Sequence, residues 1–165
     1  MSVEIVDKYK YLGTVIDNRL NWNSNTTKVY KKANQRLHFL RKLKSFDVNS
    51  KVLKLFYQST IQSVVTFGSI AWFNSLSVKD RNKLERIVKQ AKRIIGDETG
   101  NLQNLVQNSM ASKFNCILDD ITHPLNPLIV QNRSGRIRQI NLKTRRFQNS
   151  FLPTAVRNFN CNFSR

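Results

Sequence analysis

The chain has 165 residues, of which 40% are hydrophobic, and 28 Lys and Arg face only 10 Asp and Glu, for a formal net charge of +18. This length allows one modest domain or two small helical subdomains, and the charge predicts a polyanionic partner, either nucleic acid or an anionic membrane. Two distant cysteines, Cys116 and Cys161, favour neither a disulfide framework nor a zinc site, so we expect an intracellular location, in the cytoplasm or nucleus. The longest apolar stretch, residues 64–73, is too short to cross a bilayer.

Residues 1–22 are expected to form a β-hairpin. Residues 4–16 alternate and are rich in β-branched side chains, Gly13 marks a bend, and residues 17–19 suit a turn. A short hairpin cannot bury its own apolar face in water, so something must cover it. We therefore interpret the chain as the tail of a larger protein.

Residues 23–96 are expected to form a basic helical bundle. The first helix is predicted over residues 26–44, with cap candidates at residues 23–27 and a buried stripe formed by Val29, Ala33, Leu37, Leu40 and Leu43. A second helix begins near residues 49–50, and its wide apolar face comprises Val52, Leu53, Phe56, Tyr57, Thr60, Ile61 and Val64. Residues 68–76 are an apolar connector that carries Trp72 and Phe73.

A third helix is predicted between a Ser77 cap and Gly96, with Asp80 in its first turn, where the helix dipole favours an acid. Its buried stripe is formed by Leu84, Ile87, Val88, Ala91 and Ile95.

Residues 97–122 are expected to hold a further helix, from about residue 102 to 119. Residues 123–165 are expected to form a basic C-terminal segment, which contains no acidic residue. Within this segment we predict a strand pair over residues 128–143 that turns at Ser134 and Gly135. Residues 145–156 are interpreted as a docking strap with weak structure of its own. The predicted fold class is therefore mainly α: a short N-terminal hairpin, a three- to four-helix bundle and an irregular basic C-terminal segment.

Catalytic chemistry is not expected of this chain. Residues 116–120 resemble the paired-aspartate turn of polymerases, but a third carboxylate is not placed for Mg²⁺, so a solvated helix end is the better interpretation. His38 and His123 have no second ligand at metal-binding spacing, and no glycine-rich phosphate loop occurs. We predict no catalytic residue, no metal and no cofactor.

Phosphate binding is the favoured function, because the charge excess has one sign and phosphates supply most sequence-independent affinity. The candidate contact residues are Lys28, Lys31, Lys32, Arg36, Arg41, Lys42, Lys89, Lys92, Arg93, Arg136, Arg138, Arg145 and Arg146. Base stacking by aromatic side chains is a weaker alternative to their packing in the core. Its candidates are Trp22, Phe39, Phe46, Trp72 and Phe73, with Phe39 first because it lies off the apolar stripe.

Residues 11–22, YLGTVIDNRLNW, resemble the C-terminal part of LINE-type retrotransposon reverse transcriptases, as do the helical positions that follow them and the closing segments around 123–125, 134–136 and 146–160. The resemblance implies a hairpin that closes the polymerase palm, then a thumb-like bundle that grips template RNA and nascent cDNA. The palm, its fingers and its catalytic aspartates are not in this sequence, so the implied partners are nucleic acid and those polymerase parts, and no membrane partner is predicted. The isolated chain would be inactive.

The stretch from Arg36 to Lys92 also resembles the helical segment that precedes the RNA-recognition and oxygenase parts of AlkB-type tRNA-modifying enzymes. An oxygenase would need a His-x-Asp…His iron triad, and no His-x-Asp occurs, so this resemblance implies no oxygenase or methyltransferase activity here. A helical protein-interaction module is the second hypothesis. On it, exposed apolar surface around Tyr11, Trp22 and Trp72 would bind a protein, with the charge serving solubility or localisation.

Overall fold

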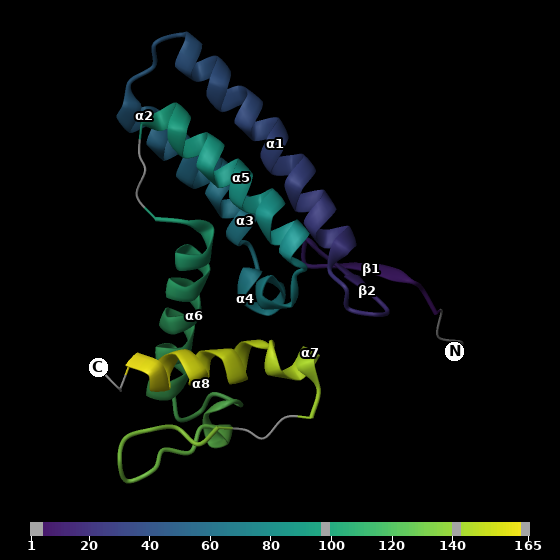
Figure 1. Cartoon of the computed structure of the whole chain (residues 1–165), viewed down its shortest axis with the longest axis vertical. Helices are drawn as coiled ribbons and strands as arrows, with labels where there is room; N and C mark the ends of the chain where they lie inside the picture. Colours follow the sequence, from purple (N-terminus) through teal and green to yellow (C-terminus); the bar gives the residue numbers. More distant parts are fainter. Residues whose placement is uncertain (1–4, 97–99, 140–142, 163–165) are drawn as a thin grey trace. The chain divides into compact units, whose positions relative to one another are not determined.

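A computed structural model describes residues 5–96, 100–139 and 143–162 of the chain, which divides into two compact units, residues 1–102 and 103–165 (Figure 1). The first unit holds β1 (Lys8–Tyr11), β2 (Thr14–Asp17), α1 (Asn23–Ser45), α2 (Ser50–Phe56), a π-helical turn (Tyr57–Gln62), α3 (Ser63–Thr66), α4 (Ser69–Trp72), a 3₁₀ turn (Phe73–Ser75) and α5 (Val78–Ile95). Nearly all of α6 (Leu102–Asp119) belongs to the second unit, with a 3₁₀ turn (Asn126–Leu128), α7 (Arg145–Gln148) and α8 (Phe151–Asn162). The predicted fold class, mainly helical with an N-terminal hairpin, is confirmed.

The hairpin is antiparallel and its turn is set by two residues. Tyr11 pairs with Thr14, and the two residues between them, Leu12 and Gly13, have φ angles of 45° and 90°. Positive φ at both central positions is the geometry of a type I′ turn, whose twist matches that of the flanking strands. Gly13 therefore bends the chain as predicted, at the tip of the hairpin.

Helix α1 begins at Asn23, earlier than predicted, and the prediction that residues 23–27 supply its side-chain cap is wrong. Trp22 occupies the N-cap position with a left-handed backbone (φ 62°) and no side-chain cap. The Asn25 carboxamide is used elsewhere, because its Oδ1 accepts a hydrogen bond from the backbone N–H of Val15 at 3.1 Å. Thr26 Oγ1 donates to the Trp22 carbonyl at 2.9 Å. The Asn25 contact joins the hairpin to the helix, and the Thr26 contact supports the first turn of the helix.

Replacing Asn25 by Ala should leave the Val15 N–H without its partner and cost about 1–3 kcal/mol of unfolding free energy. Asn25 is 2% exposed, so water cannot readily replace it. Hydrogen exchange should report faster exchange at the Val15 amide. Asn23→Ala, at an exposed position two residues earlier, is the control, and equal exchange in both variants would contradict the assigned role.

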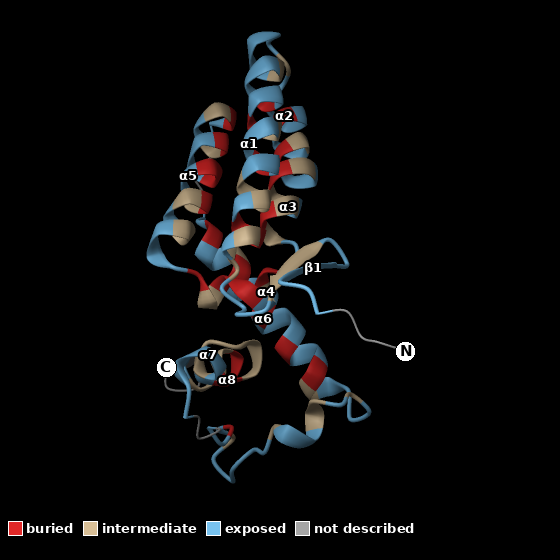
Figure 2. Cartoon of the chain, turned by 90° about the vertical axis from the view of Figure 1, so that its right-hand side faces the viewer, coloured by how far each residue is buried: buried red, intermediate tan, exposed pale blue. Residues whose placement is uncertain are grey.

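The core of the first unit lies between α1, the α2–α3 segment and α5, whose buried faces point inward (Figure 2). The predicted stripe of α5 is buried throughout, as are Ala33, Leu37 and Leu40 of α1, whereas Val29 and Leu43 of the predicted α1 stripe are only half-buried. The predicted face of the second helix needs correction, because Val52 is exposed and Phe56, Thr60 and Val64 are only half-buried. The buried row is Leu53, Tyr57, Ile61 and Val65. A π turn lies within this row, where the Ser63 N–H bonds the carbonyl of Gln58, five residues back.

Trp72 of α4 and Phe73 of the 3₁₀ turn pack inward. Trp72 and Phe73 are 1% and 2% exposed, and Trp72 Nε1 donates to the Phe67 carbonyl at 3.2 Å. Both side chains are therefore core residues, so neither can stack on bases, and Trp72 does not contribute to an exposed protein-binding surface.

Helix α5 begins with the predicted cap. Ser77 Oγ accepts a hydrogen bond from the Asp80 N–H at 3.1 Å and donates to Asp80 Oδ2 at 2.8 Å, and Lys83 Nζ lies 3.1 Å from Asp80 Oδ1. Partial burial alone would raise the pKa of Asp80, but the Ser77 and Lys83 hydrogen bonds outweigh it and hold the pKa below its usual value.

Because the folded-state pKa of Asp80 is depressed, its contribution to stability should be present above the unfolded pKa and lost as the pH falls through the folded one. At pH 7, Asp80→Asn should cost about 0.3–1 kcal/mol, the value of an acid at a helix N-terminus. Urea unfolding from pH 7 down to pH 3 should show the gap between wild type and variant closing below roughly pH 4. A gap independent of pH would contradict this assignment.

The second unit is built on α6, which runs over the predicted residues. Its buried Phe114 packs with Ile137, Ala155 and Val156 in a separate small core. Two predictions need correction here. The expected strand pair is a single bridge between Gln131 and Ile137. On its other edge, the N–H and carbonyl of Ile137 bond the Asn160 carboxamide of α8 at 3.0 and 2.8 Å, where a further strand would otherwise pair. Residues 140–142 of that prediction lie outside the described part.

The second correction concerns residues 145–156, which are helical in α7 and α8 where weak structure was predicted. Pro153 does not interrupt α8 because it lies in the first turn, where a backbone N–H has no partner within the helix. Burial of Ala155 and Val156 against α6 supplies the tertiary stabilisation that a short helix needs.

Candidate nucleic-acid interface

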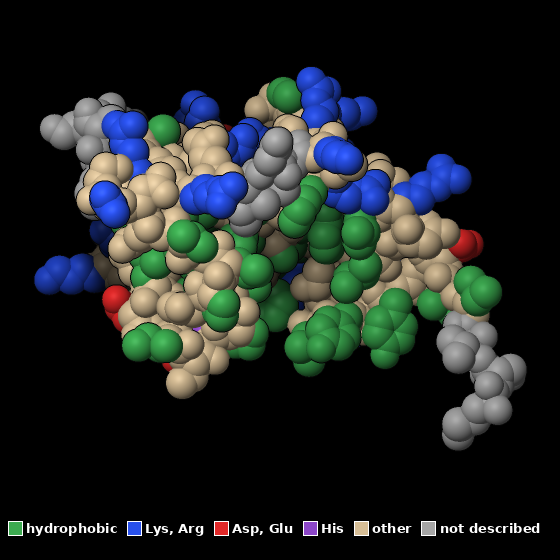
Figure 3. Space-filling view, turned by 90° about the horizontal axis from the view of Figure 1, so that it is seen from below, with side chains coloured by type: hydrophobic (Ala, Val, Ile, Leu, Met, Phe, Trp, Pro, Cys, Tyr) green, Lys and Arg blue, Asp and Glu red, His purple; other side chains and the backbone are tan. Residues whose placement is uncertain are grey.

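A hollow of about 500 Å³ in the first unit collects positive charge from two elements distant in sequence. We call it the cationic groove. Its lining comprises Lys10, Gly13, Lys28, Val29, Lys32, Arg36, Ser59, Ser63, Val64 and Phe67. Four of these side chains are cations and none is an acid. In the view of Figure 3, Lys and Arg side chains also predominate over Asp and Glu.

The geometry of the two elements explains how the cations converge. Lys28, Lys32 and Arg36 follow one another at intervals of four on α1 and therefore share one face of the helix. Lys10 lies in β1, the first strand of the hairpin that precedes α1, and its side chain lines the groove. Lys10 and Lys32 make no hydrogen bond or ion pair with any residue of the described ranges, so both ammonium groups remain available to a ligand.

Two of the cations are held in place by neutral partners. Lys28 Nζ donates to the Gly13 carbonyl at 3.1 Å, and Arg36 Nη1 donates to the carbonyl of Thr60 in the π turn. A carbonyl fixes the side chain without neutralising it, so the full positive charge persists. The ammonium has three donors and the guanidinium five, which leaves donors for an anion.

The groove also has hydroxyl and aromatic groups. Ser59 Oγ donates a hydrogen bond to the Leu55 carbonyl and Ser63 Oγ donates one to the Ser59 carbonyl. Both hydroxyl protons are therefore used in local backbone hydrogen bonds and are not available to a ligand. Phe67 is 57% exposed at the groove. An anion in the groove would therefore meet cations chiefly, with one aromatic ring at the edge.

The other predicted contact residues lie outside the groove. On α1, Lys31 and Lys42 are exposed and Arg41 Nη2 donates to Gln90 Oε1 at 3.2 Å. On α5, Lys89 and Arg93 are exposed and Lys92 Nζ donates to the Gly100 carbonyl.

The remaining predicted contacts, Arg136, Arg138, Arg145 and Arg146, are exposed in the second unit.

Sequence reasoning missed Lys10 and Phe67. Lys10 alternates with Tyr9 and Tyr11, which is the only local sign that it faces away from those tyrosines. Phe39, the leading stacking candidate, is 59% exposed on α1 but does not line the groove.

Asp120 follows the end of α6 in solvent, as predicted. Hydrogen bonds from the Thr122 hydroxyl (2.6 Å) and backbone N–H (2.9 Å) hold the pKa of Asp120 below its usual value. Over the described ranges, no group of three or more His, Cys, Asp or Glu side chains could hold a metal ion. Among the helices of those same ranges, none has the length and apolarity needed to span a membrane.

A family model described as "Alkylated DNA repair protein alkB homolog 8, N-terminal" matches residues 22–63. The matched segment contains α1, α2 and the π turn, and with them Lys28, Lys32 and Arg36 of the cationic groove. The match covers about a quarter of the chain and supports the resemblance to AlkB-type proteins over residues 36–63, where it overlaps the segment predicted to resemble them. A search of curated proteins and a search of solved structures found no match, and no match supports the resemblance to reverse transcriptases.

Proposed function

We propose that this chain is a helical module that binds the phosphate backbone of nucleic acid in the cationic groove. The observation that carries the proposal is the convergence of Lys10, Lys28, Lys32 and Arg36 without any acid among the lining residues. Like charges held close together repel one another and lower stability. Binding of a polyanion would relieve this repulsion. Phosphate contacts carry no sequence information, and the binding should be insensitive to sequence.

Salt dependence tests this proposal. Four phosphate contacts should give a slope of log affinity against log salt of about −3.6 on duplex DNA and about −2.8 on single strands. Fluorescence anisotropy with labelled oligonucleotides from low to physiological salt measures both slopes. A chain that does not bind oligonucleotides in dilute buffer would overturn the proposal.

The family match and the resemblance suggest two different parent proteins for the same module. The match to the N-terminal part of an alkylated DNA repair protein favours an AlkB-type parent for residues 22–63. The succession of hairpin and basic helix favours the thumb of a LINE-type reverse transcriptase, whose partners would be template RNA and cDNA. In both cases the chain would grip nucleic acid for a catalytic part that lies elsewhere. We therefore propose that the isolated chain catalyses no reaction.

A protein-interaction module remains the second candidate, because the outer face of the hairpin is apolar. Tyr9, Tyr11 and Leu12 are 62%, 57% and 76% exposed. Single apolar side chains are common on surfaces, but a cluster on a two-stranded hairpin suits a protein contact. Analytical ultracentrifugation separates the candidates, since a stable oligomer without affinity for nucleic acid would favour the protein contact.

A further inference from the structure

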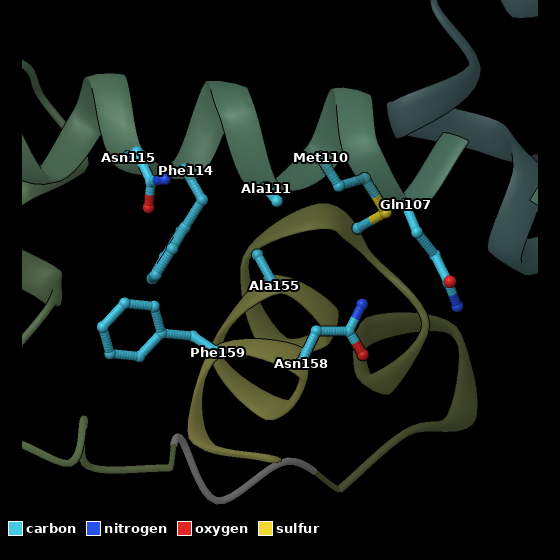
Figure 4. A pocket seen from close by; sticks show the side chains of 8 residues that line it. All are labelled: Gln107, Met110, Ala111, Phe114, Asn115, Ala155, Asn158 and Phe159. Atoms are coloured by element: carbon cyan, nitrogen blue, oxygen red, sulfur yellow. The ribbon is translucent and has the colours of Figure 1, made fainter. Parts of the chain in front are cut away.

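A second pocket lies within the second unit, between α6 and α8, and the cationic groove does not account for it. We call it the α6–α8 pocket. It encloses about 340 Å³ and is lined by Gln107, Met110, Ala111, Phe114, Asn115, Ala155, Asn158 and Phe159 (Figure 4). Its lining contains no charged side chain.

The floor of this pocket is apolar and partly aromatic. Met110 and Phe114 are each 1% exposed, and Phe159 meets Phe114 edge to face with ring centroids 5.6 Å apart. Ala111 and Ala155 face each other across the middle of the hollow in Figure 4. Their small side chains leave open the space that larger residues would fill. A flat apolar ring fits such a floor better than a charged group does.

Three carboxamides, Gln107, Asn115 and Asn158, surround this floor, Asn158 being half-buried and the other two exposed. None of the three forms a side-chain hydrogen bond with any residue of the described ranges. Each carboxamide offers both donors and an acceptor, the combination that reads the edge of a nucleobase. A purely apolar ligand would exclude water from these groups without giving them partners.

The charge around the pocket suits a ligand whose ring is neutral and whose attached group is anionic. No acid occurs from residue 121 to the end of the chain. Arg157, next to Asn158 on α8, is exposed, and within the described residues its Nη2 donates only to neutral oxygens, of Gln148 at 2.6 Å and Thr154 at 3.3 Å. A nucleotide has this distribution of charge.

We propose that the α6–α8 pocket binds one unpaired nucleobase of a single-stranded nucleic acid, with Asn158 and Gln107 reading its edge and Phe159 contacting its face. This inference rests on the proposal that nucleic acid is the partner of the chain, and it adds a base-binding site to the phosphate-binding groove. Single strands, whose bases are unstacked and accessible, would then bind through both sites, and duplexes through the groove alone.

The test uses the full chain and free nucleosides, which have a base but no phosphate. The chain has only two methionines, so the Met110 methyl group is a resolvable NMR probe at the pocket. Adenosine, guanosine, cytidine and uridine are titrated separately at low and high salt. We expect at least one nucleoside to shift the Met110 methyl signal saturably and to the same extent at both salt concentrations, because the ligand is uncharged.

Ala111→Leu should abolish this shift by filling the hollow, and Asn158→Ala should weaken the nucleoside affinity by roughly tenfold through loss of an edge contact. Ser112→Leu is the matched control, because it adds the same side chain at an exposed position of α6 outside the lining. The absence of a shift with all four nucleosides would overturn the inference. So would a shift that persists in Ala111→Leu, or an equal shift with N-acetyl-leucinamide, which would indicate an apolar peptide site.

The test of the α6–α8 pocket can be distinguished from the test of the cationic groove. The variant Lys10→Glu/Lys32→Glu should retain nucleoside binding unchanged, because a nucleoside has no phosphate for the groove to contact. Nucleoside binding without salt-dependent duplex binding would therefore refute the groove and support the pocket. The reverse result would refute the pocket alone.

Discussion

Replacing Lys10 and Lys32 together by Glu should weaken duplex binding roughly 10²-fold at 50 mM salt and reduce the salt slope from about −3.6 to about −1.8. These two cations line the groove from β1 and α1, and neither has a partner in the described part of the chain. Their replacement therefore removes phosphate contacts without breaking internal hydrogen bonds. Fluorescence anisotropy across a salt series measures both the affinity and the slope.

The double variant Lys51→Glu/Lys79→Glu is the matched control. It changes the net charge by the same amount, and both positions are exposed and outside the groove. Both also lie near the start of a helix, where Glu is compatible with the dipole. We expect its slope to remain close to that of the wild type. Equal losses in the two double variants would show that total charge, and not the groove, determines the binding.

Trp72→Ala should lower the unfolding free energy by about 3–5 kcal/mol, the usual cost of truncating a large buried aromatic side chain. Trp72 is 1% exposed and donates to the Phe67 carbonyl, so truncation opens a cavity and leaves that carbonyl without a donor. Urea unfolding followed by circular dichroism measures the difference. Phe67 also lines the cationic groove, so the hydrogen bond from Trp72 helps to position one residue of the candidate site.

Two further variants separate the structural role of Trp72 from a role in binding. Trp72→Phe keeps most of the apolar volume and loses the hydrogen bond, so its cost should be smaller, about 1–2 kcal/mol, with nucleic-acid affinity unchanged. Phe39→Ala, at a side chain that is 59% exposed, should alter stability by less than about 0.5 kcal/mol. A stable Trp72→Ala variant that had lost affinity for single strands would instead restore the stacking hypothesis.

The elements that local rules determine were predictable. Helix α5 has a Ser77 cap, a one-sided apolar stripe and a terminal Gly96 with φ 80°, and each of these acts within one or two turns of the chain. Helix α6 and the turn at Gly13 follow similar rules. The start of α1 was not predictable in this way, because Asn25 bonds Val15 of a different element. The helix over residues 151–162 likewise depends on packing against Phe114.

The sequence by itself determined the mainly helical fold and the one-sided excess of positive charge, because short-range periodicity and composition suffice for these. The charge calls for a polyanionic partner, and the resemblance to a polymerase thumb directs the proposal to nucleic acid. Only the tertiary structure decided which cations act together. It placed Lys10 of a strand beside three cations of α1, made Trp72 part of the core, and left a hollow between Ala111 and Ala155. The physical reason is that grooves and pockets form where elements distant along the chain pack against one another, and no local pattern encodes their mutual placement.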